Sequence, residues 1–244
     1  MSGHSHAKKI KHQKAVTDQK RGQIFSKMAR VISIAAKEGG PNPESNPKLA
    51  VAIETAKRLN LPKENIERAV KRGTGEEAAN EKLEEVCFEA FGPEGTAVII
   101  EGITDNKNRT LSEIKQILNQ YNGKLVGEGA VKWLFEKRGV IAIVPSAQSP
   151  VKTNEELELA AIEAGAEDVR WYDEDMEVYV KPEELEKVKK SLEEKGINTD
   201  STSLDWVAKE EVFLDENKKT SCQKLFDALD ESDSVQDVYS NLRL

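Results

Sequence analysis

The side chains best suited to a chemical role in this sequence are the cations near its beginning. Eight of the first thirty residues are Lys or Arg, and Asp18 is the only acid among those thirty. Lys and Arg neutralise phosphates and release condensed counterions, so that many weak contacts add up. We therefore predict that this segment and the helices after it bind a polyanion, through Lys8, Lys9, Lys11, His12, Lys14, Lys20, Arg21, Lys27, Arg30, Arg58, Arg68, Lys71 and Arg72.

The three histidines raise the alternative of a metal site, because His4 and His6 are spaced as two ligands could be and His12 follows. No cysteine or suitable acid accompanies them, so the ligand set of a zinc site is incomplete. We expect no metal, and expect partly protonated histidines to assist phosphate contacts. Because every histidine lies in the basic segment, no nucleophile, base and orienting group can be assembled, and the sequence predicts neither an enzyme nor a cofactor.

The charge of the chain is divided between its two parts. The formal net charge is −8, yet residues 1–75 hold sixteen Lys or Arg against six Asp or Glu. The remaining residues hold 20 basic and 38 acidic side chains. Such asymmetry is typical of a protein that binds a polyanion at one end, while the acidic remainder does not attract one.

The composition is that of a globular protein, with 38% hydrophobic and 33% charged residues. The longest aliphatic run, 140–144, is far too short to span a bilayer, so no membrane partner is expected. No secretory segment precedes the basic residues, which we take as part of the mature protein. Cys87 and Cys222 lie far apart among apolar neighbours, so we expect two reduced, packed thiols in a cytoplasmic protein. We also favour a monomer as the oligomeric state.

Apolar residues recur at spacings of three and four after residue 23, which predicts an amphipathic helix. Ile24, Met28 and Ile32 belong to its inward stripe. Lys27 and Arg30 fall off that stripe, and we expect them on the solvent side.

Two shorter helices are predicted after the first. Asn46 is suited to cap the second helix, with Pro47 at its first position. The third is expected over about 62–72, ended by Gly73 and Gly75. We take these glycines as helix terminators, because the spacing of a phosphate-binding loop and its preceding strand are both missing.

The later part of the chain alternates strands and helices. Strands are expected at 86–91, 96–103, 131–135, 140–144, 169–172, 177–180, 204–208 and 235–239, and helices from about Asn108, which would be the N-cap, and around 157–164, 185–192 and 222–229. A hairpin turn is expected at 92–95, between the first two strands, and the acids at 173–175 are expected at a hairpin tip. Residues 140–208 follow the β-α-β-β-α-β order of a ferredoxin-like unit.

We therefore predict an α+β protein in which an N-terminal three-helix domain precedes two ferredoxin-like α+β domains, one inserted in the other. The helical domain and its arm cover residues 1–78. The discontinuous domain covers residues 79–136 plus 206–244, and the inserted domain covers residues 137–205.

Several short segments, in this order and spacing, resemble those of the YebC/PmpR-type probable transcriptional regulators, a family with mitochondrial relatives that activate translation. They are GHS (3–5), IKH (10–12), DQKRG (18–22), AAKEGG (35–40), NIERA (65–69), GTG (73–75), TDNKNRT (104–110) and VQDVYSN (235–241). The resemblance covers nearly the whole chain. One departure is Ala7, where the family usually has Trp, so an aromatic contact from that position is not expected here.

The resemblance implies a helical domain followed by two α+β domains, and a cytoplasmic, nucleic-acid-binding role without enzymatic activity or cofactor. It leaves two hypotheses about the partner: a DNA-binding transcriptional regulator, or an RNA- or ribosome-associated translation factor that assists elongation. A third hypothesis is a protein-interaction scaffold whose acidic body docks partners.

The residues themselves favour phosphate and shape contacts over base readout. The gap between the first two predicted helices, from Gly39 to Asn46, is about twice the turn of a helix-turn-helix motif. Residues 1–75 contain a single aromatic side chain, Phe25, which belongs to the inward stripe. We therefore expect no stacking platform for bases in this domain, which suits modest sequence specificity or a structured RNA.

Overall fold

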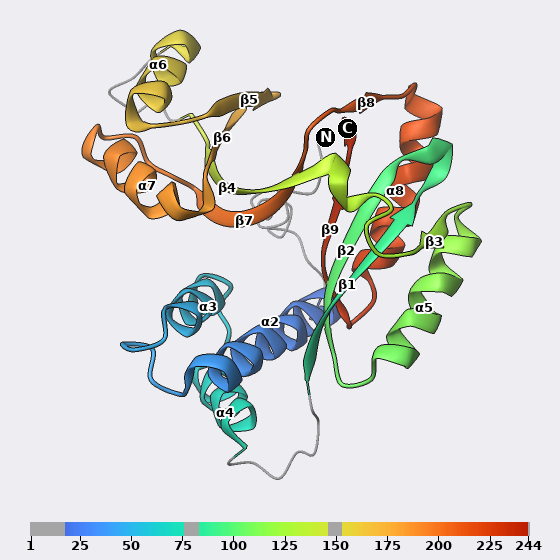
Figure 1. The fold of residues 1–244 in the computed structure, drawn as a ribbon. Coiled ribbons are helices and arrows are strands. Elements are labelled where there is room, and N and C mark those ends of the chain that lie inside the picture. The colour runs from blue at the N-terminus through green and yellow to red at the C-terminus, as the bar shows by residue number, and fades with distance from the viewer. Residues whose placement is uncertain (1–17, 76–82, 146–152, 244) are drawn as a thin grey trace.

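The computed structural model describes residues 18–75, 83–145 and 153–243 (Figure 1). Three helices come first, and two four-stranded antiparallel sheets follow, each covered on one face by two helices. The predicted α+β class with a helical N-terminal domain is therefore confirmed. Among the described residues, none of the helices is both long and apolar enough to cross a membrane.

The N-terminal domain consists of α2 (Asp18–Gly39), α3 (Pro47–Arg58) and α4 (Lys63–Thr74) around one apolar cluster. The predicted cap is confirmed, since the Asn46 side chain accepts a hydrogen bond from the Leu49 N–H at 3.1 Å and Pro47 follows it. The Asn46 amide also donates to the Ala35 carbonyl oxygen at 2.8 Å. One buried side chain thus caps α3 and ties it to the end of α2.

Gly73 has a different role from the predicted one. It lies inside α4, which ends at Gly75 with φ of 78°. A Cβ atom at Gly73 would lie 2.2 Å from the carbonyl oxygen of Ser33, so the absence of a side chain lets α4 pack closely on α2. The Ser33 hydroxyl completes this contact by donating to the Ala69 carbonyl oxygen at 2.7 Å.

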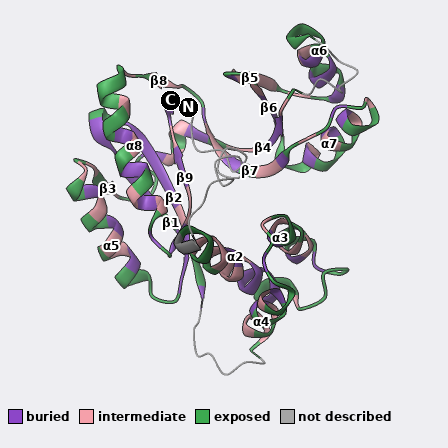
Figure 2. Ribbon diagram, turned by 180° about the vertical axis from the view of Figure 1, so that it is seen from behind, coloured by how far each residue is buried: buried purple, intermediate pink, exposed green. Residues whose placement is uncertain are grey.

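The first sheet has the order β3-β1-β2-β9 and is made from both ends of the α+β region. Its strands are β1 (Glu84–Phe91), β2 (Ala97–Thr104), β3 (Lys124–Val126) and β9 (Val235–Ser240). Helices α5 (Lys107–Gln120) and α8 (Glu216–Asp230) pack on one face, and their outer sides are exposed (Figure 2). The expected turn at 92–95 is present as η2 (Pro93–Gly95). The N-cap of α5 is Asn106, two residues before the expected Asn108.

The second sheet has the order β5-β6-β4-β7, and its elements follow the predicted β-α-β-β-α-β sequence. They are β4 (Phe135–Ile143), α6 (Asn154–Ala164), β5 (Asp168–Tyr172), β6 (Asp175–Val180), η4 (Pro182–Glu184), α7 (Leu185–Glu194) and β7 (Ser201–Ala208). The expected hairpin tip at 173–175 lies between β5 and β6. The first sheet differs from this order, because two strands precede its first helix.

The long β4–β7 ladder joins the two sheets. It runs from the pair Phe135–Ala208 to the pair Ala142–Ser201. Phe135 and Ala208 pack with Ala97 and Ile99 of the first sheet, on the face that α5 and α8 leave open. The proposed division at residues 136 and 206 therefore falls within these strands, and the exact domain limits stay a prediction. Two short strands, β8 (Val212–Phe213) and β10 (Leu242–Arg243), pair near the C-terminus.

The segment between β3 and β4 is held by a buried carboxylate. The expected strand at 131–135 is wrong, because η3 (Lys132–Leu134) occupies most of it and β4 starts at Phe135. Glu89, which is 4% exposed, accepts backbone N–H donors from Gly129 at 2.6 Å, Val131 at 2.8 Å and Lys132 at 2.9 Å. Burial acts to raise the pKa of the Glu89 carboxyl, but these three donors outweigh it and lower the pKa.

The two cysteines differ in environment. Cys222 is buried in the first core, as expected, whereas Cys87 is exposed on the open face of the first sheet. Strand alternation predicts which face of the sheet Cys87 lies on, but it does not predict whether another element covers that face.

Replacing Gly73 with Ala should destabilise the protein by about 1–3 kcal/mol, because the new methyl group would force α4 away from the Ser33 carbonyl. Gly22→Ala is the matched control: Gly22 lies in α2 with no atom near a Cβ position, so that change should stabilise by about 0.5–1 kcal/mol. Urea unfolding of the two variants measures the difference. Equal effects of both changes would contradict the close contact.

Replacing Glu89 with Gln should lower the free energy of unfolding by about 2 kcal/mol at neutral pH, because charged hydrogen bonds to three N–H groups are lost. The folded-state pKa of Glu89 lies below its ordinary value of 4.5, so its stabilisation is present above about pH 4.5 and is lost as the pH falls through the lowered pKa. The gap between wild type and E89Q should therefore shrink in acid. Urea unfolding at pH 7 and at several lower pH values tests this, and a gap that widens in acid would refute it.

Candidate nucleic-acid interface

The predicted contact residues fall into three groups. Lys8, Lys9, Lys11, His12 and Lys14 lie outside the described residues, so their role stays a prediction, as does the expectation for His4 and His6. Lys20 and Arg21 lie exposed in the first turn of α2. Arg58, Arg68 and Lys71 are exposed on α3 and α4, and Arg72 is half-buried. Lys27 and Arg30 face the α+β body, the part of the protein from β1 to the C-terminus.

Lys27 and Arg30 dock α2 onto the C-terminal end of α8. Lys27 Nζ donates to the Asp230 carbonyl oxygen at 2.6 Å, and Arg30 donates to the Asp233 carbonyl oxygen at 2.5 Å. The Gln23 amide donates to the Glu231 carbonyl oxygen beside them. The last carbonyls of a helix lack intrahelical donors and carry partial negative charge, so cations from another element stabilise them.

This docking corrects the expectation that Lys27 and Arg30 lie on the solvent side of α2. Both are half-buried, and the Lys27 side chain is only 15% exposed. A stripe of apolar residues shows which face of a helix packs in its own bundle. It cannot show that a second domain covers part of the remaining face.

The docking extends along α2 through apolar and polar contacts. Ile34 of α2 packs with Leu83 and Ile103 of the first sheet region. Lys37 Nζ donates to the Leu83 carbonyl oxygen at 2.8 Å, and Lys48 Nζ lies 3.8 Å from the Glu85 carboxylate. The helical domain is thus fixed against the start of β1.

A second set of cations remains available to an external partner. Lys20, Arg58, Arg68 and Lys71 are exposed, and among the described residues none of the four forms an ion pair. Lys48 and Lys63 of the same domain differ, since each lies within 4 Å of a carboxylate of Glu38 or Glu67. The interface that the structure leaves open is therefore a subset of the predicted one.

The local structure of α3 and α4 explains part of this arrangement. Both helices carry two cations in their last turn, where positive charge complements the helix dipole. Arg68 and Lys71 are three residues apart and so lie on one face of α4. The connection between α3 and α4 is four residues long, which is the length of the turn in a helix-turn-helix motif. It is shorter than the connection between α2 and α3, which is too long for such a motif.

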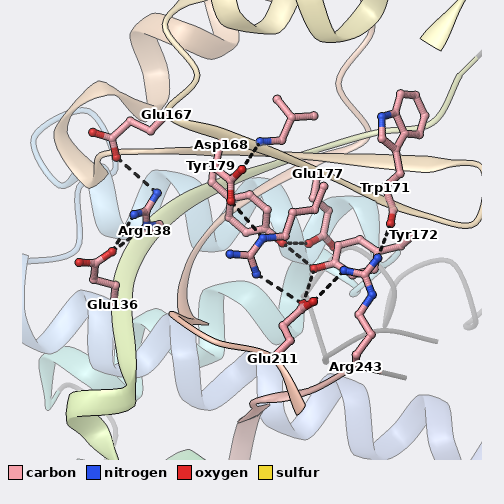
Figure 3. A network of polar contacts seen from close by, with 12 residues as sticks. Glu136, Arg138, Glu167, Asp168, Trp171, Tyr172, Glu177, Tyr179, Glu211 and Arg243 are labelled. Carbon is pink, nitrogen blue, oxygen red and sulfur yellow. Dashed lines mark hydrogen bonds and ion pairs between the residues drawn. The ribbon is translucent and has the colours of Figure 1, made fainter. Parts of the chain in front are cut away.

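The densest group of ionisable side chains in the described region lies between the two sheets, and Figure 3 shows it as a connected network. Glu211 accepts from Arg243 at 2.7 Å, from the Tyr172 hydroxyl at 3.2 Å and from Arg170 at 3.4 Å. The Tyr179 hydroxyl lies 3.1 Å from the Tyr172 hydroxyl and donates to Glu177 at 2.6 Å. Burial, followed by the Glu177 charge, raises the pKa of Tyr179.

This network binds elements together and leaves little room for a substrate. It joins β5 and β6 of the second sheet to the C-terminal β10. The hollow beside it has a volume of about 50 Å³, enough for one or two water molecules. A wider open depression of about 510 Å³ is lined by ion pairs such as Arg138–Glu136 at 2.7 Å and Arg170–Asp168 at 3.0 Å, so its charges are balanced.

Two sequence profiles together match most of the chain. Residues 5–76 match the TACO1/YebC protein N-terminal domain, and residues 83–242 match the TACO1/YebC second and third domain. The boundary between the matches falls where the structure passes from helices to sheets.

Proteins similar over nearly their full length occur in several bacteria. A probable transcriptional regulatory protein of Persephonella marina is 47% identical over 100% of this chain and 96% of its own length. One of Thermotoga maritima is 43% identical over 100% of this chain and 94% of its own. The crystal structure of a conserved hypothetical protein from Aquifex aeolicus is similar with a TM-score of 0.84 and 44% identity, covering 98% of this chain and 97% of that one.

Replacing Lys27 and Arg30 together with Ala should lower the free energy of unfolding by about 2 kcal/mol, because the carbonyl oxygens at the end of α8 lose charged donors. Lys57→Ala, also in the helical domain but exposed, should change stability by less than about 0.5 kcal/mol. Urea unfolding provides the comparison. If the double variant were as stable as the control, the docking contacts would contribute nothing.

Proposed function

The chain belongs to the TACO1/YebC family, and on that premise we propose that it is a non-catalytic cytoplasmic regulator of gene expression that binds nucleic acid through its N-terminal domain. Its relatives are named probable transcriptional regulatory proteins, which supports a regulatory role and makes DNA the first candidate partner. The observation that carries the proposal is that several exposed cations on one small domain form no ion pair among the described residues, and they include Lys20, Arg58, Arg68 and Lys71 of the predicted contact set.

The exposed side chains of α3 and α4 indicate how this domain would bind nucleic acid. Each phosphate that a cation neutralises releases counterions. For duplex DNA it adds about 0.9 to the magnitude of the slope of log affinity against log salt concentration. The exposed side chains of α4 are Lys63, Glu64, Glu67, Arg68 and Lys71. Arg can contact guanine, but Asn and Gln, the usual readers of adenine, do not occur on the exposed faces of α3 and α4. Phosphate contacts therefore dominate in this domain.

A structured RNA, within the ribosome or outside it, is the second candidate partner, in a translation factor that assists elongation. The observation that favours it is that α3 and α4 carry no fully exposed Asn or Gln side chain. Double-stranded RNA is recognised mainly by shape and by contacts to phosphate and 2′-hydroxyl groups, which suits such a surface.

Reversing three of the charges, with Arg58→Glu, Arg68→Glu and Lys71→Glu in one variant, should weaken binding to duplex DNA and to a structured RNA by on the order of tenfold or more. It should also reduce the salt slope by about 2–3, because three phosphate contacts are lost. Lys181→Glu, Lys187→Glu and Lys190→Glu in one control variant change the net charge equally, on exposed positions of the inserted domain. That control should bind nearly as wild type does.

Fluorescence anisotropy with labelled duplex DNA and a labelled RNA hairpin, at several salt concentrations, measures both quantities. Equal losses in the two variants would mean that total charge, and not this domain, governs binding. Absence of binding by the wild type at low salt to both probes would refute the proposal. A preference for the hairpin that survives physiological salt would favour RNA over DNA.

A further inference from the structure

The segment from Gly127 to Leu134, which connects β3 to β4, is unusually well fixed for a surface connection. The buried Glu89 carboxylate holds it from below through three backbone N–H groups. Val131 is fully buried within the segment, and Phe135, directly after it, is 3% exposed. The Leu134 carbonyl oxygen accepts the Lys209 N–H at 2.9 Å. The backbone is therefore anchored at both ends and in the middle.

This fixed segment presents one large aromatic side chain to solvent. Trp133 is 65% exposed although it lies between two buried apolar residues. Its indole N–H donates to the Ala130 carbonyl oxygen at 3.1 Å, which holds the edge of the ring while its surface stays open. Because Trp133 buries little surface, it contributes little to folding.

Trp206 differs from Trp133 because other side chains contact its ring and its N–H group. Its ring has Lys132 Nζ at 4.8 Å and Lys137 Nζ at 4.9 Å from the ring centroid, and its indole N–H donates to Glu101 at 2.7 Å. The surface and the polar edge of that indole are thus engaged inside the molecule. Of these two indoles, Trp133 is the one held in place with an accessible surface.

The surroundings of Trp133 indicate what it could hold. The other exposed residues of the segment are Gly127, Glu128, Gly129 and Ala130, which add little apolar area for a protein partner. The charged residues of the segment and of its C-terminal flank are balanced, because Glu128 and Lys132 lie in the segment and the charge of Lys209 acts on Glu136 directly after it. A flat, weakly charged group therefore fits better than a phosphate or an apolar helix, and a nucleobase is such a group.

We propose that Trp133 is a stacking platform for an unpaired base of a single-stranded nucleic acid, a contact point additional to the cations of the helical domain. The proposal rests on the proposed function, since it assumes a nucleic-acid partner. It adds an exposed aromatic side chain, which the helical domain does not offer because Phe25 packs against its core.

The test uses the full chain and a labelled twenty-nucleotide poly(U) RNA, with a labelled RNA duplex of the same length as comparison. Trp133→Leu keeps apolar bulk but removes the aromatic face, and should weaken binding of the single strand about tenfold while leaving the duplex within about twofold. Its salt slope should match that of the wild type, because no charge is lost. Trp133→Phe should retain most of the affinity. Leu159→Ala, at a 56% exposed position on α6, is the control and should bind as wild type does.

A second readout is intrinsic fluorescence. Saturating poly(U) should quench the emission of the wild type, and most of that quenching should disappear in Trp133→Phe although the RNA still binds. Thermal unfolding should show that all four proteins share nearly the same midpoint. Unchanged single-strand affinity and unchanged quenching in the Trp133 variants would overturn the platform.

The outcomes separate this inference from the proposed function. If the wild type bound and the Arg58, Arg68 and Lys71 reversals weakened binding while Trp133→Leu did not, only the platform would be wrong. If Trp133→Leu weakened binding and the charge reversals did not, the proposed cationic interface would be wrong and the platform would stand. A wild type that bound neither RNA nor DNA would overturn both.

Discussion

The contact between α2 and the C-terminal end of α8 is the constraint from which the rest of the arrangement follows. Lys27 donates to the carbonyl oxygen of Asp230, the last residue of α8, at 2.6 Å, and Arg30 donates to that of Asp233, three residues further on, at 2.5 Å. An apolar contact at Ile34 and Leu83 lies next to it on the same helix. Because α2 is the central helix of its bundle, fixing it also fixes which faces of α3 and α4 point to solvent.

This contact divides the cations of the helical domain by role. Lys27, Arg30 and Lys37 donate to backbone carbonyls of the body, whereas Arg58, Arg68 and Lys71 remain at the surface. A cation held against a helix end is already partly neutralised, so it attracts a phosphate less strongly. Among the described residues, the excess of positive charge in this domain therefore overstates the charge that remains exposed, and the exposed part includes Arg58, Arg68 and Lys71 of α3 and α4.

Carboxylates play a structural part in the acidic body. Glu89 fixes the connection between β3 and β4, and Glu211 joins β5 to β10 through two arginines. Glu101 of β2 accepts the indole N–H of Trp206 in β7 and so links the two sheets. In each case one acid gathers donors from elements far apart in the chain. These ionisable groups thus hold together segments that are distant in the chain.

The sequence by itself determined the local elements and their order. The cap at Asn46, the turn at 92–95 and the β-α-β-β-α-β order of the second sheet follow from periodicity and turn chemistry, which depend on near neighbours. Only the tertiary structure decided which side chains of these elements stay exposed. Lys27 meets a carbonyl about two hundred residues later, and Val131–Phe135 becomes a helical turn because Glu89, about forty residues earlier, accepts its N–H groups. Trp133 lies in that turn and is 65% exposed. Contacts between distant residues carry no periodic signal, so the interface had to come from the folded chain.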